Sequence, residues 1–239
     1  MNRRHNLKLL AGAFALTAAP AIIGRAPVMA QTAAPTFTLP PLGYAYEALE
    51  PHIDTATMNF HHKNHHNAFI GNLNGLVEKY ADLKSKPIEE ILSNISAIPE
   101  AVRGPVRNNL GGHFNHTFFW DLMTPGGAKV PGGDLKAAID GTLGGPDKLM
   151  EAVNQAGMTR FGSGWAWLVV NKDKKIAVIN TPYQDTPHMD AGAKPILGID
   201  VWEHAYYLKH QYKRAEYLKT WWNVVNWDKA AANFKKATA

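Results

Sequence analysis

The segment Asp200-Val201-Trp202-Glu203-His204 sets a carboxylate and an imidazole four residues apart, at the end of the apolar run Ile196–Val201. Aspartate and histidine together form a ligand pair that suits iron, manganese or zinc. A pair with this spacing also arises by chance, so by itself it is only a hypothesis of a metal site. Its meaning depends on which other ligands the chain can bring to the same place.

The N-terminal half of the chain contains two further groups of histidines. The first group falls in a stretch that predicts a helix, and consists of His61, His62, His65 and His66. In a helix the first and third of these share one face, and the second and fourth share the neighbouring face. The second group, His113 and His116, lies in Gly111–Trp120, whose glycines permit close approach and whose aromatic residues would restrict water.

Each group also has a simpler explanation. Four histidines on one helix can form a solvated surface, and a single buried histidine can be a hydrogen-bonded core residue. The chain contains no cysteine, which excludes thiolate sites and leaves nitrogen and oxygen as the only metal ligands. Histidines on two helices, combined with Asp200 and His204, favour one shared metal site.

The order of the periodic segments predicts an α+β fold. The chain has 239 residues, of which 46% are apolar and 19% charged, as in folded globular proteins. Helical patterns predict an N-terminal helical hairpin at residues 54–80, 87–92 and 99–120. Later patterns predict short helices at 134–142 and 146–156, strands at 165–170, 175–180 and 196–201, and helices at 204–225 and 227–236. We expect an N-terminal α-hairpin domain at residues 31–124 and a C-terminal α/β domain at residues 125–239.

Residues 1–30 have the pattern of a cleavable export signal peptide. A basic start precedes an apolar stretch that is too short and interrupted for a comfortable membrane span, and small residues lead to a cleavage site after Ala30. A retained membrane anchor is the alternative. Arg3 and Arg4 resemble a twin-arginine signal, but Asn6 stands where an apolar residue is usual, so the Sec route also stays open. We expect an exported, periplasmic protein with no stable membrane span in the mature chain.

The signal also changes the interpretation of the charge. Residues 1–30 contain four basic residues and no acid, so their removal takes the formal net charge from +5 to +1. The mature chain therefore shows no basic character that would predict binding to nucleic acid.

Several motifs, in matching order, resemble the iron/manganese superoxide dismutase family. The signature of that family is present as Asp200-Val-Trp-Glu-His-Ala-Tyr-Tyr207. The other matching segments are residues 39–53, 61–74, 111–120, 160–167 and 222–227, so the resemblance covers nearly all of residues 37–236. It implies an N-terminal helical hairpin followed by a C-terminal domain in which helices surround a three-stranded antiparallel sheet.

The resemblance implies a superoxide dismutase, an oxidoreductase with one mononuclear metal ion. The implied metal ligands are His61, His116, Asp200 and His204. The ion would cycle between +2 and +3, oxidise one superoxide anion to dioxygen and reduce the next to hydrogen peroxide, with a bound solvent molecule supplying a proton. Zinc is excluded as the working metal because it has no redox chemistry. By the same resemblance, His62 and His66 return to structural roles and His113 becomes a core residue.

Further residues would surround the metal. Gln184 would reach the bound solvent, Trp165 and Trp202 would wall the site, and His65 would lie beyond the ligands or at an interface. A glutamine after the second strand, with Gly112 at the position where iron-type members carry glutamine, is typical of the manganese type. We therefore favour manganese, and iron is the alternative because both metals use the same ligands.

Two other features of the family bear on this chain. At the mouth of the active-site funnel, where the family places tyrosine, the chain has Phe69, so the hydroxyl is missing there and proton delivery or peroxide release would change. Glu203 would bond to the partner subunit's metal-ligand histidine, and Tyr207 would meet the histidine that corresponds to His65 across a two-fold interface. The expected assembly is a homodimer or a tetramer.

Two other functions compete with this interpretation. A mononuclear non-haem iron oxygenase also uses histidine and carboxylate ligands, but it needs a polar pocket for an organic substrate rather than tightly packed aromatic residues and glycines. A non-catalytic metal-binding protein of the same fold is the second alternative. The complete set of ligands argues against it, whereas Phe69 leaves it open.

Overall fold

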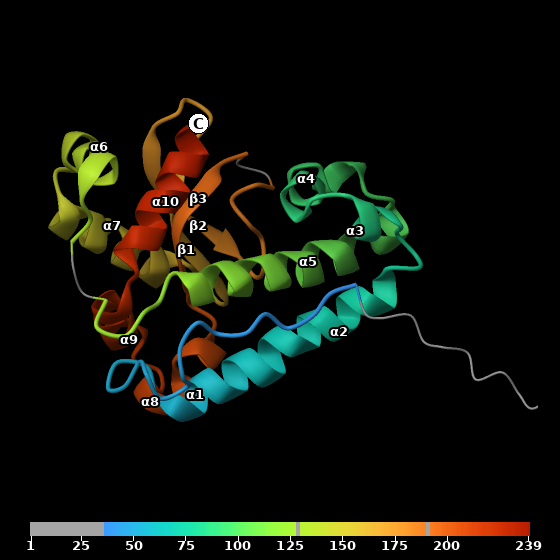
Figure 1. Ribbon diagram of the computed structural model, residues 1–239, viewed down its shortest axis with the longest axis horizontal. Coiled ribbons are helices and arrows are strands. Elements are labelled where there is room, and N and C mark those ends of the chain that lie inside the picture. The colour runs from blue at the N-terminus through green and yellow to red at the C-terminus, as the bar shows by residue number, and fades with distance from the viewer. Residues whose placement is uncertain (1–35, 128–129, 190–191) are drawn as a thin grey trace, which may run out of the picture. The chain divides into compact units, whose positions relative to one another are not determined.

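The computed structural model describes residues 36–127, 130–189 and 192–239 (Figure 1). The predicted signal peptide at residues 1–30 lies outside the described residues. Among the helices that are described, none is both long and apolar enough to cross a membrane.

The N-terminal region is a pair of long helices that pack against each other (Figure 1). The first consists of α1 (Thr55–Phe60), a π-helical stretch η1 (His61–His66) and α2 (Asn67–Leu76). Asp54 caps its start, because the Asp54 Oδ1 atom accepts a hydrogen bond of 2.8 Å from the Thr57 amide. The second long helix is α5 (Glu100–Asp121). The short helices α3 (Asp82–Ser85), α4 (Ile88–Ser93) and η2 (Ile95–Ala97) connect the two.

The C-terminal region contains a three-stranded antiparallel sheet in the order β2-β1-β3. The strands are β1 (Gly164–Val170), β2 (Ile176–Pro182) and β3 (Lys194–Asp200). All seven residues of β1 are buried, so the central strand is covered on both faces. The register pairs Trp165 of β1 with Asp200 of β3 and with Thr181 of β2. This register brings the end of β3 next to the loop that follows β2.

Helices from both regions cover the sheet. The C-terminal helices are α6 (Gly133–Leu143), α7 (Pro146–Thr159) and α10 (Trp227–Thr238). Helix α7 contacts β1 and β2, α10 contacts β3, and α5 of the hairpin also contacts β3. The helical hairpin, the three-stranded antiparallel sheet and the surrounding helices confirm the predicted α+β fold.

The predicted helix over residues 204–225 is wrong as a single element. The structure divides it into η3 (Glu203–Ala205), α8 (Tyr207–His210), α9 (Arg214–Trp221) and η4 (Trp222–Val224). Gln211 ends α8 with a left-handed φ of 48°, which a helix cannot continue through. The Arg214 guanidinium, at the start of α9, donates hydrogen bonds to the carbonyls of Arg160 and Gly162 at 2.8 and 2.9 Å. These long-range bonds fix the direction of α9 and are not encoded in the local helical pattern.

Candidate metal centre

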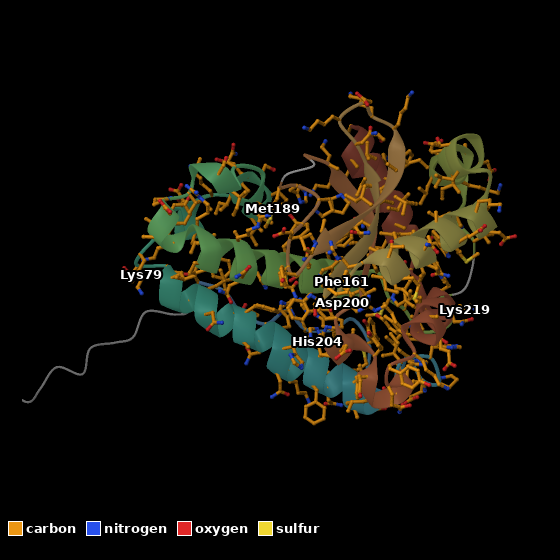
Figure 2. The ribbon with its side chains drawn as sticks, turned by 180° about the vertical axis from the view of Figure 1, so that it is seen from behind. Lys79, Phe161, Met189, Asp200, His204 and Lys219 are labelled. Atoms are coloured by element: carbon orange, nitrogen blue, oxygen red, sulfur yellow. The ribbon has the colours of Figure 1, made fainter. Side chains whose placement is uncertain are left out.

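Four predicted ligands meet where the two regions contact each other. The candidate ligand atoms of His61, His116, Asp200 and His204 all lie within 4.8 Å of one another. The Oδ2 atom of Asp200 lies 3.1 Å from His61 Nε2, 3.7 Å from His116 Nε2 and 3.2 Å from His204 Nε2. Figure 2 shows Asp200 and His204 in the interior, between the helical hairpin and the end of the sheet. Four separate elements, η1, α5, β3 and η3, therefore supply one cluster.

Two histidines of this cluster each have a buried ring nitrogen without a hydrogen bond. The Nε2 atoms of His61 and His116 are buried and have no hydrogen-bond partner among the described residues. A buried nitrogen without a partner is destabilising by about 1–3 kcal/mol. His116 Nδ1 lies 2.6 Å from the Gly112 carbonyl, which can only accept, so the proton is on Nδ1 and the lone pair is on Nε2. A metal ion at the centre would satisfy both unpaired nitrogens.

The spacing also fits one ion. Ligand atoms about 2.1 Å from a shared ion are at most about 4.2 Å apart. The observed upper limit of 4.8 Å therefore requires only small movements of the side chains. The donor set, three imidazoles and one carboxylate, suits iron or manganese.

Burial sets the protonation of the cluster. Burial, followed by the neighbouring His204, lowers the pKa of His61 to about 4, and burial lowers the pKa of His116 well below its usual value. Burial opposes ionisation of Asp200, but His204 and His61 beside it hold the pKa of its carboxyl below the usual range. The Trp202 amide also donates a hydrogen bond of 2.8 Å to Asp200 Oδ1. Histidine binds a metal as the neutral imidazole, so three histidine ligands beside the carboxylate would surround an ion with one negative charge, which suits a cation.

Aromatic rings enclose the ligands. Trp120 meets His61 edge to face at 4.8 Å, Trp165 meets His116 at 5.4 Å, and Trp202 stacks on His204 at 5.5 Å between ring centroids. Trp165 is fully buried. These rings restrict water and hold the imidazoles in orientation. Trp165 and Trp202 therefore lie against two of the candidate ligands, and their roles in the reaction stay predictions.

Gln184 is buried beside this enclosure. Its Oε1 atom accepts hydrogen bonds from Trp165 Nε1 at 3.1 Å and from Asn115 Nδ2 at 3.3 Å. Because an indole nitrogen can only donate, Oε1 must face Trp165, and this fixes the orientation of the amide. The opposite atom, Nε2, is buried without a hydrogen-bond partner among the described residues. An unused donor at this position can serve a solvent molecule or an anion at the metal.

Sequence reasoning missed Asn115. This residue is completely buried, and its Nδ2 atom also donates to the Gln184 backbone carbonyl at 3.1 Å. The available signal was its place between His113 and His116 in an otherwise apolar and glycine-rich segment. A polar side chain in such a buried segment needs a partner.

Phe69 and Gly112 are in direct contact. A Cβ atom on Gly112 would lie 2.7 Å from atoms of the Phe69 ring, so no side chain fits there without movement of the ring. The Phe69 ring lies 5.3 Å from the His116 ring. The Phe69 ring therefore fills the space that a glutamine side chain at position 112, expected for the iron type, would need.

The remaining predicted residues lie at the edge of the site. His65 is exposed and stacks on His204 with ring centroids 4.2 Å apart. Glu203 and Tyr207 are exposed, and Glu203 directly precedes the candidate ligand His204 in the sequence. Their contacts with a second subunit stay predictions.

The other histidines of the two groups have structural partners. His62 Nδ1 accepts a hydrogen bond from the Tyr46 hydroxyl, and His62 Nε2 donates to the Pro40 carbonyl, both at 2.8 Å. His66 Nδ1 accepts from Trp120 Nε1 at 3.0 Å, and His66 Nε2 donates to His113 Nδ1 at 2.9 Å. The structure thus gives His62, His66 and His113 core roles, in agreement with the sequence analysis.

Comparison with known proteins gives consistent matches. Residues 36–124 match the family of iron/manganese superoxide dismutases, alpha-hairpin domain, and residues 131–233 match the family of iron/manganese superoxide dismutases, C-terminal domain. A manganese superoxide dismutase of Thermus thermophilus is 57% identical over 201 residues, which are 84% of this chain and 98% of the relative. A relative from Methylomonas sp. (strain J), named for manganese or iron, is 51% identical over 85% of this chain and 100% of its own. A manganese superoxide dismutase of Listeria innocua is 50% identical over 84% of this chain and 99% of its own.

The arrangement predicts that metal binding depends on the charge of Asp200. We expect Asp200→Asn to lower the affinity for manganese by at least about tenfold, because a neutral amide replaces the carboxylate that faces the three imidazoles. Metal analysis after dialysis against graded chelator concentrations measures this affinity. The matched control is Asp173→Asn, the same change at an exposed residue between β1 and β2. Equal metal retention by both variants would contradict the assignment.

Proposed function

The chain belongs to the iron/manganese superoxide dismutase family, and on this premise we propose that it works with one manganese ion per subunit, bound by His61, His116, Asp200 and His204. As a superoxide dismutase, it converts superoxide to dioxygen and hydrogen peroxide. The observation that carries the proposal is the convergence of three imidazoles on one buried carboxylate oxygen, with two imidazole nitrogens left unpaired.

The reaction takes two superoxide anions and two protons to one dioxygen and one hydrogen peroxide. A bound manganese or iron ion supplies the one-electron exchange between its +2 and +3 states. Asp200 and the imidazoles of His61, His116 and His204 would hold the ion with a net ligand charge of −1, so the centre would keep a positive charge that attracts an anion. The Nε2–H groups of Gln184 would offer an unused donor to a solvent molecule or to the substrate anion at the centre. Trp165, Trp120 and Trp202 restrict other water, so that the donor acts in a region of low dielectric constant.

Two features support manganese over iron. Gln184 comes from the loop after β2, as expected for the manganese type, and the Phe69 ring occupies the space next to Gly112 where the iron type would place its glutamine. The relatives named above are manganese or manganese/iron enzymes. Iron remains the alternative because the four ligands are the same for both metals.

We expect the apoprotein reconstituted with manganese to dismute superoxide at least about tenfold faster than the iron-loaded form. A superoxide assay on protein of measured metal content tests this. Zinc-loaded protein is the control, and it should be inactive because zinc has no redox chemistry. A protein active only with iron would contradict the choice of manganese. A protein inactive with both redox metals would favour the non-catalytic alternative.

The missing hydroxyl at Phe69 predicts altered kinetics of proton delivery or peroxide release. The variant Phe69→Tyr would restore a hydroxyl at the mouth of the site, and we expect proton delivery or peroxide release to change by about threefold to tenfold. Stopped-flow kinetics over a range of superoxide concentrations measure turnover and product inhibition. Phe114→Tyr, the same substitution at a residue that packs against His188, is the control. The hypothesis fails if Phe69→Tyr matches the wild type in both turnover and product inhibition at every concentration.

We propose a homodimer, or a tetramer built from it, in which Glu203 and Tyr207 reach the site of the partner subunit. Both residues are exposed and therefore accessible to a second subunit, and Glu203 directly precedes the ligand His204 in the sequence. We expect sedimentation to give a dimer or a tetramer at micromolar concentration, and Glu203→Ala to weaken assembly by about tenfold or more. A wild-type protein that is monomeric and fully active would refute the proposal.

We also propose export to the periplasm through the signal at residues 1–30, with the twin-arginine route favoured and the Sec route as the alternative. The twin-arginine route exports folded proteins, which would allow the metal to be loaded first. Cell fractionation should find the wild type in the periplasm and the double variant Arg3→Lys, Arg4→Lys retained in the cytoplasm. Export of the variant at wild-type levels would favour the Sec route, and retention of the wild type would refute export. The boundaries at residues 30 and 124 stay predictions.

A further inference from the structure

A bidentate ion pair joins α5 to the loop after β2. Arg107 donates from Nε to Asp185 Oδ1 at 2.6 Å and from Nη2 to Asp185 Oδ2 at 2.7 Å. The side chains are only 30% and 14% exposed. A fork of this kind fixes the geometry of both partners as well as attracting them. Asp185 directly follows Gln184, so the pair acts on the backbone that carries the Gln184 amide.

The loop that carries Gln184 is a turn that needs external support. Tyr183, the residue before Gln184, has a left-handed φ of 49°, which is unfavourable for a residue with a side chain. The Asp185 amide closes the turn on the Pro182 carbonyl at 3.0 Å. The Thr181 hydroxyl donates to the Asp185 carbonyl at 2.7 Å and accepts from Trp167 Nε1 at 2.9 Å. These bonds hold the turn on the side of the sheet.

On the other side, three residues of α5 hold the same loop. A Cβ atom on Gly111 would overlap the Gln184 carbonyl oxygen, so only glycine permits this close approach. Asn115 donates to the same carbonyl. Arg107, Gly111 and Asn115 are spaced by four residues and therefore share one face of α5. The next residue after this stripe is the ligand His116, so one helix sets both the metal ligand and the loop.

We propose that the Arg107–Asp185 pair is a positioning device that holds the Gln184 amide in place at the metal centre. The inference rests on the proposed function and extends the set of functional residues to a pair that does not touch the ligands. Without the fork, the strained turn loses this ion pair to α5, and Gln184 gains freedom to move. The Gln184 Nε2 donor then spends less time directed at the metal centre, where an anion would bind.

A merely structural pair would stabilise the loop without acting through Gln184. The two roles are separated by a double-mutant cycle on manganese-loaded, full-length protein. Azide is the probe, because it is a small anion whose binding can be followed by the visible absorption of the oxidised metal. The variants are Arg107→Gln and Arg107→Lys, each made with Gln184 intact and in a Gln184→Ala background. Arg107→Lys keeps the charge but loses the fork, so it preserves the test if Arg107→Gln does not fold.

The matched control is Arg103→Gln, one turn earlier on α5, where the Arg103 Nε atom donates to the Ile98 carbonyl at 2.9 Å. We expect Arg107→Gln to weaken azide binding by about threefold to tenfold, Arg107→Lys to have a smaller effect in the same direction, and Arg103→Gln to change it by less than about twofold. In the Gln184→Ala background, the Arg107 substitutions should have no further effect.

Azide affinity within about twofold of wild type in both Arg107 variants would overturn the positioning role. An equal loss of affinity with and without Gln184 would also overturn it, because the pair would then act by another route. The wild-type superoxide assay is read separately. If the wild type is active and the variants bind azide with unchanged affinity, only the positioning role of the Arg107–Asp185 pair is refuted. If the wild type is inactive, the proposed function is refuted, and the azide measurements still test the positioning role.

Discussion

The structure depends on one buried carboxylate. Asp200 is completely buried, and taking a carboxylate out of water costs several kcal/mol unless partners compensate for it. One of its oxygens faces three imidazole nitrogens, and two of those nitrogens have no other partner among the described residues. The cluster is therefore complete only with a cation. The helical hairpin and the C-terminal region, with the sheet, each supply ligands, so a bound cation would also link these two regions.

The sheet register links the buried Asp200 to other residues of the site through Trp165. Trp165 pairs with Asp200 across the sheet, packs against His116 and donates to Gln184. Helix α5 links the same parts of the site from the helical hairpin, because it provides His116 and holds the Gln184 loop through Asn115. A ligand, a wall of the site and a hydrogen-bond donor are thus connected by a few rigid contacts. Chemistry that needs a charged site, little water and a fixed donor follows from this arrangement.

Much of this could be predicted from the sequence because it is local. Apolar runs and turn residues located the three strands. The histidine and aspartate motifs supplied the candidate ligands, and the resemblance to the family selected the four residues of the cluster among them. The π-helical stretch at His61–His66 and the break at Gln211 were not predicted, since nothing in the local pattern marks either. Asn115 and the Arg107–Asp185 pair were missed for a different reason. Their partners lie 69 and 78 residues away, so only the assembled fold reveals them.

The most direct test of this account is a crystal structure of the manganese-loaded protein with anomalous diffraction measured at the manganese edge. The account predicts one anomalous peak per subunit, about 2.0–2.2 Å from the Nε2 atoms of His61, His116 and His204 and from Asp200 Oδ2. It also predicts that Gln184 Nε2 donates a hydrogen bond to the solvent at the metal. A peak at another site, or a metal bound without Asp200, would contradict the central claim.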